Sequence, residues 1–295
     1  MGEQDLGKPR ASACKEKLAE LNEYVPVRIL DGPLPTTREA LAPYKVVVLS
    51  GQSLADQLVI NNVTHGLNNC FISADTFGLF ASVFCDFGTG FAVSDPTGEP
   101  PVQGIIGGIT YDTEGIVTMA EETRHGLETG DFITFHEVRG MTELNECPAI
   151  PVKVLGPYTF SIGDTSKMGP WQGGGVFEQV KQTRTFDFKS LQQSLANPEI
   201  LISDFAKIDR QNQLHAGMQA LHKFREQHNG FPRPRNSLDA TELVALTKQI
   251  LIDEVVDEKL ISELSFQAQG ALSPMTTFIG GFVAQEVLKV PIHLT

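Results

Sequence analysis

Lys45-Val46-Val47-Val48-Leu49-Ser50-Gly51 is the stretch that decides the fold of the first part of this chain. An unbroken apolar run that is rich in β-branched residues and ends at a glycine is typical of a strand covered on both faces. A helical pattern from 54 to 63 and a second strand pattern from 70 to 74 follow it. The order of strand, helix and strand predicts an α/β fold of the doubly wound, Rossmann-like type.

The sequence before this strand predicts one helix and one further strand. Leu18 and Leu21 lie at helical spacing among Lys and Glu residues between 8 and 22. The run Val25-Pro26-Val27-Arg28-Ile29-Leu30 ends at the turn residues of 31–33, and it predicts a strand.

From Phe91 onward the pattern changes to short apolar runs separated by glycine. Four of these runs lie at 115–118, 131–135, 152–155 and 158–162. Strands this short and this closely spaced predict a small all-β barrel or sandwich of about 90 residues. We therefore expect a barrel-like domain over 92–184, inserted behind a first domain over 1–91.

Helical patterns return after the β region. Apolar residues recur at helical spacing around Leu221 and Leu243, with Asp239 as the predicted N-cap of the second helix and a loop over 230–235. These patterns predict a helical bundle over 185–269. The stretch 270–295 is expected to form a last helix, which is capped by Ser273 and returns to the first domain.

Composition narrows the functional class. A formal net charge of −13 over 295 residues repels phosphate backbones, so nucleic acid is not an expected partner. The chain has neither an apolar run of about 20 residues nor a signal-peptide start, so we expect no membrane association and a cytoplasmic or nuclear location. Its four cysteines are scattered and are expected to be reduced thiols.

Candidate chemical motifs do not define an active site. Asp86-Phe87-Gly88-Thr89-Gly90 begins like a phosphate-binding loop, but Val93 replaces the third glycine and a strand pattern follows, not a helix. The Gly173-Gly174-Gly175 run also precedes a strand. His215 and His222 lie seven residues apart, about 10 Å along a helix axis, which is too far for one metal ion. We expect no catalytic residue, bound cofactor or metal in this chain.

Longer motifs indicate a function that single residues do not, because several segments resemble the ubiquitin-activating enzyme family. The similarity runs through nearly the whole chain. It is carried by Gly7-Lys8-Pro9-Arg10-Ala11, Phe84-Cys85-Asp86-Phe87-Gly88, Arg124-His125-Gly126-Leu127-Glu128-Thr129-Gly130-Asp131-Phe132, Val154-Leu155-Gly156-Pro157-Tyr158-Thr159-Phe160-Ser161-Ile162, Pro232-Arg233-Pro234-Arg235-Asn236, Phe278-Ile279-Gly280-Gly281 and Ala284-Gln285-Glu286-Val287.

The resemblance implies a domain order. Residues 1–91 are expected to form part of an inactive adenylation domain that lacks its first strand, glycine turn and helix. Residues 92–184 resemble the first catalytic-cysteine half-domain, which does not carry the cysteine, and 185–269 resemble a four-helix bundle. The chain is then a fragment of the family's N-terminal portion.

A scaffold and ubiquitin-binding role follows from that order. The parent enzyme adenylates ubiquitin with MgATP, carries it as a thioester and passes it to conjugating enzymes, whereas this chain alone is expected to be inactive. Its expected partners are ubiquitin and the active adenylation domain, with conjugating enzymes reached through the parent. Two alternatives remain: an activating enzyme for another ubiquitin-like modifier, and a free-standing nucleotide-dependent α/β enzyme.

Arg124 and Glu128 are the residues expected to contact ubiquitin. The run 123–130 lies between two strand patterns, and such connecting segments are exposed and carry function more often than strands do. The residues alone favour a solvated turn in which the two charges pair with each other. The resemblance of the Arg124–Glu128 motif to a family segment that faces ubiquitin favours the contact.

Overall fold

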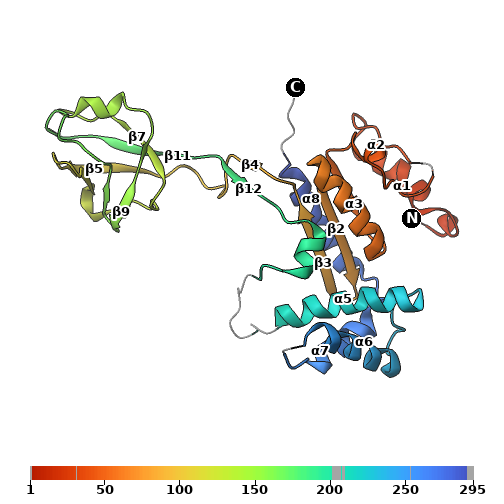
Figure 1. The fold of residues 1–295 in the computed structure, drawn as a ribbon. Coiled ribbons are helices and arrows are strands. Elements are labelled where there is room, and N and C mark those ends of the chain that lie inside the picture. The colour runs from red at the N-terminus through yellow and green to blue at the C-terminus, as the bar shows by residue number, and fades with distance from the viewer. Residues whose placement is uncertain (1, 31, 201–206, 208–209, 253, 291–295) are drawn as a thin grey trace. The chain divides into compact units, whose positions relative to one another are not determined.

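The computed structural model describes residues 2–30, 32–200, 207, 210–252 and 254–290. The chain divides into two compact units. One comprises Met1–Asp86 together with Ser190–Thr295, and the other comprises Phe87–Lys189 (Figure 1). Both units contain a sheet, and the fold is mixed α/β as expected.

The first unit is built on a three-stranded sheet in the order β1–β2–β3. β1 (Val46–Leu49) is parallel to β2 (Cys70–Phe77), and the helix between them is α3 (Leu54–Leu67). These three elements confirm the strand, helix and strand predicted from the sequence. β3 (Phe80–Asp86) is antiparallel to β2, so the described part of this sheet is mixed and not purely parallel.

Helices cover both faces of this sheet. Phe71 of β2 packs with Ile60 of α3 in one buried cluster. Cys85 pairs with Ile72 across β2 and β3. The pKa of its thiol is raised mainly by burial and also by the negative charge of Glu286 in α8 (Ser273–Leu288). Side chains alternate along a strand, so the neighbours Phe71 and Ile72 point to opposite faces, and α3 and α8 lie on opposite sides of the sheet (Figure 1).

The predicted strand at 25–30 is not formed. That stretch has no regular secondary structure, and Val25 and Leu30 are 54% and 64% exposed. A strand is stable only with a hydrogen-bonded neighbour, and none of the described residues pairs with this stretch. The preceding helix prediction is confirmed by α1 (Arg10–Ala19); the short η1 (Glu3–Asp5) and α2 (Arg38–Leu41) complete this part.

The rest of the first unit is helical. It consists of α4 (Leu191–Ala196), α5 (Arg210–His228), α6 (Ser237–Ile250) and α7 (Glu258–Gln267). Leu221, Leu243 and Ile261 are fully buried in the bundle core, which also takes in Phe77 at the end of β2. The bundle therefore packs against the β2–β3 end of the sheet.

Two predicted caps were wrong by a few residues. Asn236, not Asp239, is the N-cap of α6 and accepts from the amides of Leu238 and Asp239. Leu272, not Ser273, is the N-cap position of α8, and it makes no side-chain cap. In both helices, the polar residue that suggested a cap lies inside the first turn.

The second unit is antiparallel throughout. Two short strands, β4 (Phe91–Val93) and β12 (Arg184–Phe186), pair where the chain enters and leaves it. Between them lies a seven-stranded sheet. Its order is β8 (Ile150–Pro151), β7 (Phe132–His136), β11 (Val176–Val180), β5 (Gln103–Ile109), β6 (Ile116–Met119), β10 (Thr159–Ser161) and β9 (Lys153–Gly156).

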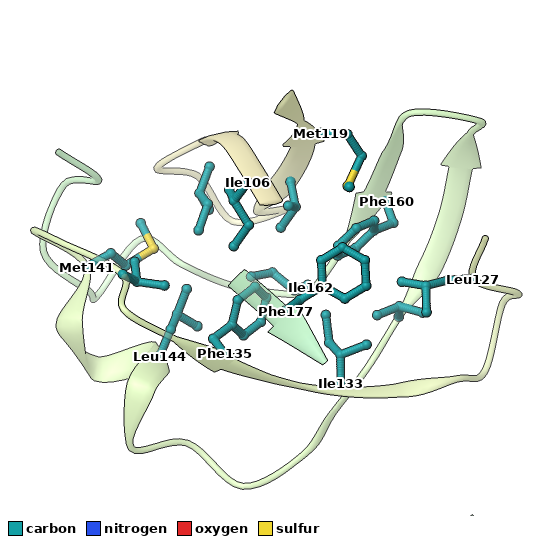
Figure 2. Packing of buried hydrophobic residues seen from close by; sticks show 14 residues of the cluster. Ile106, Met119, Leu127, Ile133, Phe135, Met141, Leu144, Phe160, Ile162 and Phe177 are labelled. Carbon is teal, nitrogen blue, oxygen red and sulfur yellow. The ribbon is translucent and has the colours of Figure 1, made fainter. Parts of the chain in front are cut away.

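This sheet curls around a core. Its two edge strands, β8 and β9, are consecutive in the chain and are separated only by Val152, so the two edges of the sheet must meet there. Phe135, Phe160 and Phe177 fill the interior, and each is at most 1% exposed (Figure 2). Two short 3-10 helices, η2 (Ala120–Glu122) and η3 (Thr142–Asn145), lie in its connections.

Candidate functional site

Arg124 and Glu128 lie on one connecting segment of the second unit, between η2 and β7. Both side chains are exposed, as the sequence predicted. Neither forms a hydrogen bond through its charged group or an ion pair with any residue that the structure describes. The alternative in which the two residues pair with each other is therefore not the arrangement found.

The backbone that carries these two charges is held at several points. His125 donates to the carbonyl of Gly156 over 2.7 Å, and its other ring nitrogen accepts from the amide of Leu127 over 2.9 Å. The Glu128 amide donates to Asp131 Oδ2 over 2.9 Å. His125 is 3% exposed and Leu127 is 6% exposed. The segment thus alternates buried anchors with exposed charges.

A cleft of about 310 Å³ opens beside Glu128. Its wall also includes Glu99, Lys181 and Arg184, but not Arg124. Lys181 donates to Asp95, and this hydrogen bond is the main reason why the pKa of the Asp95 carboxyl lies below its usual range. The structure therefore brings Glu128 to a charged cleft, whereas Arg124 is exposed and is not part of the cleft wall.

The glycine motif after β3 does not form an open phosphate site. Asp86 is fully buried and accepts from Asn61 Nδ2 at 2.8 Å, and it lies 2.9 Å from His65 Nδ1. The Gly90 amide donates to Asp187 Oδ1 at 2.7 Å, so the carboxylate already occupies the place of an anion. β4 follows, and the helix N-terminus that a phosphate loop needs is absent from this stretch.

The turn at the carboxyl end of β1 is where open α/β sheets usually bind ligands. Here the Gly51 amide donates to Asp75 Oδ1 at 2.5 Å, and the carbonyls of Gly51 and Gln52 accept from the Arg225 guanidinium at 3.1 and 2.9 Å. Arg225 comes from the helical bundle. The turn's polar groups are used to join the sheet to the bundle.

Histidines and cysteines do not assemble a reactive centre in the described part of the chain. No group of three His, Cys, Asp or Glu side chains is placed to hold a metal ion there. His215 contacts the Leu195 carbonyl at 3.2 Å, and burial lowers the pKa of His222, which lines a separate cavity of about 490 Å³. Burial also raises the pKa of the Cys70 and Cys85 thiols to about 11.

Two residues with structural roles near the candidate motifs were not singled out from the sequence. His125 was quoted only as part of a motif, yet it fixes the segment that carries Arg124 and Glu128. Asn61 was not singled out, yet its amide also accepts from the Leu191 amide at 2.7 Å, so it joins the two points at which the chain leaves and re-enters the first unit. Neither has a sequence signal of its own, because Asn61 acts through contacts with residues far along the chain, and His125 combines a local contact with Leu127 and a distant one with Gly156.

The fold and the site define a class: an α/β domain interrupted by a curled antiparallel β domain and followed by a helical bundle. Residues 112–181 match the family model described as the ubiquitin-activating enzyme E1 FCCH domain, and residues 182–251 match the one described as the ubiquitin-activating enzyme E1 four-helix bundle. The first match covers the strands from β6 to β11, and the second covers α4, α5 and α6.

Whole-chain relatives agree with these two matches. The chain is 47% identical over 294 residues to ubiquitin-like modifier-activating enzyme 1 of Rattus norvegicus and 49% identical over 292 residues to ubiquitin-activating enzyme E1 1 of Schizosaccharomyces pombe. It is 42% identical to ubiquitin-like modifier-activating enzyme 6 of Mus musculus. These alignments cover 97%, 97% and 95% of this chain, but only 28%, 28% and 27% of the relatives.

The chain therefore belongs to the ubiquitin-activating enzyme E1 family, and it spans a little over a quarter of the length of these relatives.

Proposed function

We propose that this chain is a non-catalytic scaffold and ubiquitin-binding portion of an ATP-dependent ubiquitin-activating enzyme. Such an enzyme adenylates ubiquitin with MgATP, carries it as a thioester and passes it to conjugating enzymes. The observation that carries the proposal is the pair of exposed charges, Arg124 and Glu128, on a backbone held by His125, Leu127 and Asp131; neither charge is paired with a residue that the structure describes.

A held segment suits recognition of a folded partner. Binding costs less when the contacting residues are already ordered, because little conformational freedom is then lost. One positive and one negative exposed group on the same segment match a partner with both signs of charge. Rim charges of this kind add mainly to the association rate and to specificity, and their effect decreases with salt.

Helix α8 supplies a second surface for the scaffold role. Its sequence is mostly apolar, yet none of its residues is buried, and Phe278 and Leu288 are 70% and 75% exposed. An exposed apolar surface of this kind is typical of a protein–protein interface. We assign it to contact with the active adenylation domain of the parent enzyme.

Two further candidate functions follow from the sequence. An activating enzyme for another ubiquitin-like modifier is favoured by two of the relatives, ubiquitin-like modifier-activating enzymes 1 and 6, whose names refer to ubiquitin-like modifiers. A free-standing nucleotide-dependent enzyme is disfavoured, because the amide of Gly51 is bound to Asp75 and its carbonyl is bound to Arg225.

The remaining proposals concern location and other partners. We propose that the protein is cytoplasmic and nuclear, because its sequence lacks a signal-peptide pattern. We also propose that it does not bind nucleic acid, because its net charge of −13 repels phosphate backbones. Within the described residues, no helix combines the length and apolarity that crossing a bilayer requires. This chain itself is proposed to hold no cofactor, with MgATP bound elsewhere in the parent enzyme.

A titration of isotope-labelled ubiquitin with the full chain at low ionic strength tests the proposal. We expect shifts of ubiquitin resonances confined to one charged face, and we expect added salt to reverse them. A ubiquitin spectrum that stays unchanged at the highest concentration of chain contradicts the proposal. Tighter binding of a different ubiquitin-like modifier in the same assay selects that alternative.

A further inference from the structure

His125 lies between the two exposed charges of the candidate site, but it faces inward. Its side chain is 3% exposed, and its ring packs edge-on against Phe160 with the centroids 5.4 Å apart. Both ring nitrogens are used. Nε2 lies 2.7 Å from the Gly156 carbonyl oxygen, and Nδ1 lies 2.9 Å from the Leu127 amide nitrogen.

These two partners fix the form of the imidazole. A carbonyl oxygen only accepts, so Nε2 carries the hydrogen. A backbone N–H only donates, so Nδ1 carries none and offers its lone pair to Leu127. The ring is therefore neutral, with the hydrogen on Nε2, and each nitrogen satisfies a backbone group.

The bond from Leu127 to His125 also sets the path of the backbone. A side chain that accepts from the amide two residues ahead closes a small turn, as Asn and Asp do in Asx-turns. Here the turn contains Gly126, whose φ of +68° is easily adopted only by glycine. Beyond it Leu127 enters the core and Glu128 returns to the surface, so the turn sets the separation between Arg124 and Glu128.

We propose that His125 is the positioning residue of this surface: its Nδ1 acceptor, and not its bulk, holds Arg124 and Glu128 in the arrangement that a ubiquitin-like partner recognises. The inference rests on the proposed function for the identity of the partner. The part of the inference that concerns the turn is independent of the proposed function, because the turn is measured without any partner. His125 is expected to contact no ligand.

Three substitutions at His125 separate the contributions of the two ring nitrogens from the contribution of the ring's volume. In His125→Asn, the side-chain oxygen takes the place of Nδ1 and keeps the acceptor for Leu127. In His125→Gln, the longer side chain reaches toward the Gly156 carbonyl and keeps the donor, but it loses the acceptor. In His125→Phe, the ring remains against Phe160 and both hydrogen bonds are lost.

The experiment measures amide hydrogen exchange at Leu127 and Glu128 in the full 295-residue chain, together with ubiquitin affinity. Loss of one hydrogen bond is worth about a factor of five to ten, so His125→Gln and His125→Phe are expected to speed Leu127 exchange and weaken ubiquitin binding by about that factor. His125→Asn is expected to stay within about threefold of the parent chain in both measurements.

The outcomes distinguish the two claims. Slow Leu127 exchange in both His125→Gln and His125→Phe overturns the positioning role, as does a His125→Asn chain that exchanges as fast as His125→Gln. If His125→Phe does not fold, the comparison of His125→Asn with His125→Gln decides. If the parent chain binds no ubiquitin, the proposed function fails, whereas the exchange rates still decide whether Nδ1 holds the turn.

Discussion

Arg233 holds the carboxylate of Asp239 through two side-chain hydrogen bonds, of 3.0 Å from Nε and 2.7 Å from Nη2. The Arg233 amide also donates to the same carboxylate over 2.7 Å. The run Pro232–Asn236, which marks the family in the sequence, is thus a structural element that fixes the start of α6. The hydrogen bond from the Arg233 side chain is the main reason why the pKa of Asp239 is lowered to about 2.

Arg233→Met is expected to lower the free energy of unfolding at pH 7 only modestly, because the Arg233 side chain is 66% exposed and water screens the pair. The lowered pKa means that the carboxylate stabilises the fold above about pH 4, and that this contribution is lost as the pH falls through about 2. Urea unfolding at pH 7 and at about pH 2 measures it. Arg235→Met, at an exposed residue of the same run, is the control. An equal loss at both pH values contradicts the assignment.

Two glycines of β5 provide a matched test of the second unit's core. A Cβ at Gly104 would lie 2.5 Å from Met119 Cε and 2.6 Å from Phe177 Cε1, whereas a Cβ at Gly108 would meet no atom within 4 Å. Gly104→Ala is expected to cost about 1–3 kcal/mol, and Gly108→Ala is expected to change stability by less than about 0.5 kcal/mol. Thermal unfolding of the two variants gives the comparison. Equal stability of the two would mean that β5 does not face the core as described.

The cysteines give a test of the inactive assignment. Burial raises the pKa of the Cys70 and Cys85 thiols to about 11, so only about one molecule in a thousand is thiolate at pH 8. Iodoacetamide should modify both at least about a hundredfold more slowly in the folded chain than in urea. With ubiquitin and MgATP, the chain should form no thioester and exchange no pyrophosphate. A reducible ubiquitin adduct on any cysteine would refute the inactive assignment.

The exposed face of α8 predicts self-association of the isolated chain. Phe278→Lys should lower the sedimentation coefficient at high concentration and reduce the binding of an apolar dye, because this change breaks the apolar surface. Folding should be unaffected, since Phe278 is 70% exposed. Thr276→Lys places the same charge on an exposed residue of the same helix and is the control. If dye binding and sedimentation respond equally to both substitutions, the assignment of an interface to α8 is contradicted.

Local sequence patterns predicted two kinds of element: helices, which form their backbone hydrogen bonds within the segment, and strands that are buried on both faces. The run 45–51 and the glycine-separated strands were found because β-branched apolar residues leave few alternatives. The stretch 25–30 is also rich in branched apolar residues and is not a strand, because strand formation depends on a neighbour that composition does not reveal.

The helix N-caps and the candidate site also show that local sequence does not reveal which partner a side chain will contact. Asp239 looked like an N-cap because Asp is a preferred one, but Asn236 holds that place and Asp239 pairs with Arg233. Arg124 and Glu128 were found through a motif, and their exposure is confirmed. The role of His125 was not predicted, because its partner Gly156 lies 31 residues further along the chain and is brought to it by the pairing of β9, β10 and β6.

The most direct test reverses both charges of the candidate site, Arg124→Glu with Glu128→Arg, and measures ubiquitin affinity at low and at physiological ionic strength. Net charge is unchanged, so only the local pattern differs. Lys248→Glu with Glu258→Lys, an exposed ion pair of the bundle 2.6 Å apart, is the matched control. The account predicts that the site reversal raises Kd by about 5- to 30-fold at low salt, which corresponds to about 1–2 kcal/mol, that salt shrinks the effect, and that the control changes nothing. A site-reversed chain that binds ubiquitin as tightly as the parent at low ionic strength would contradict it.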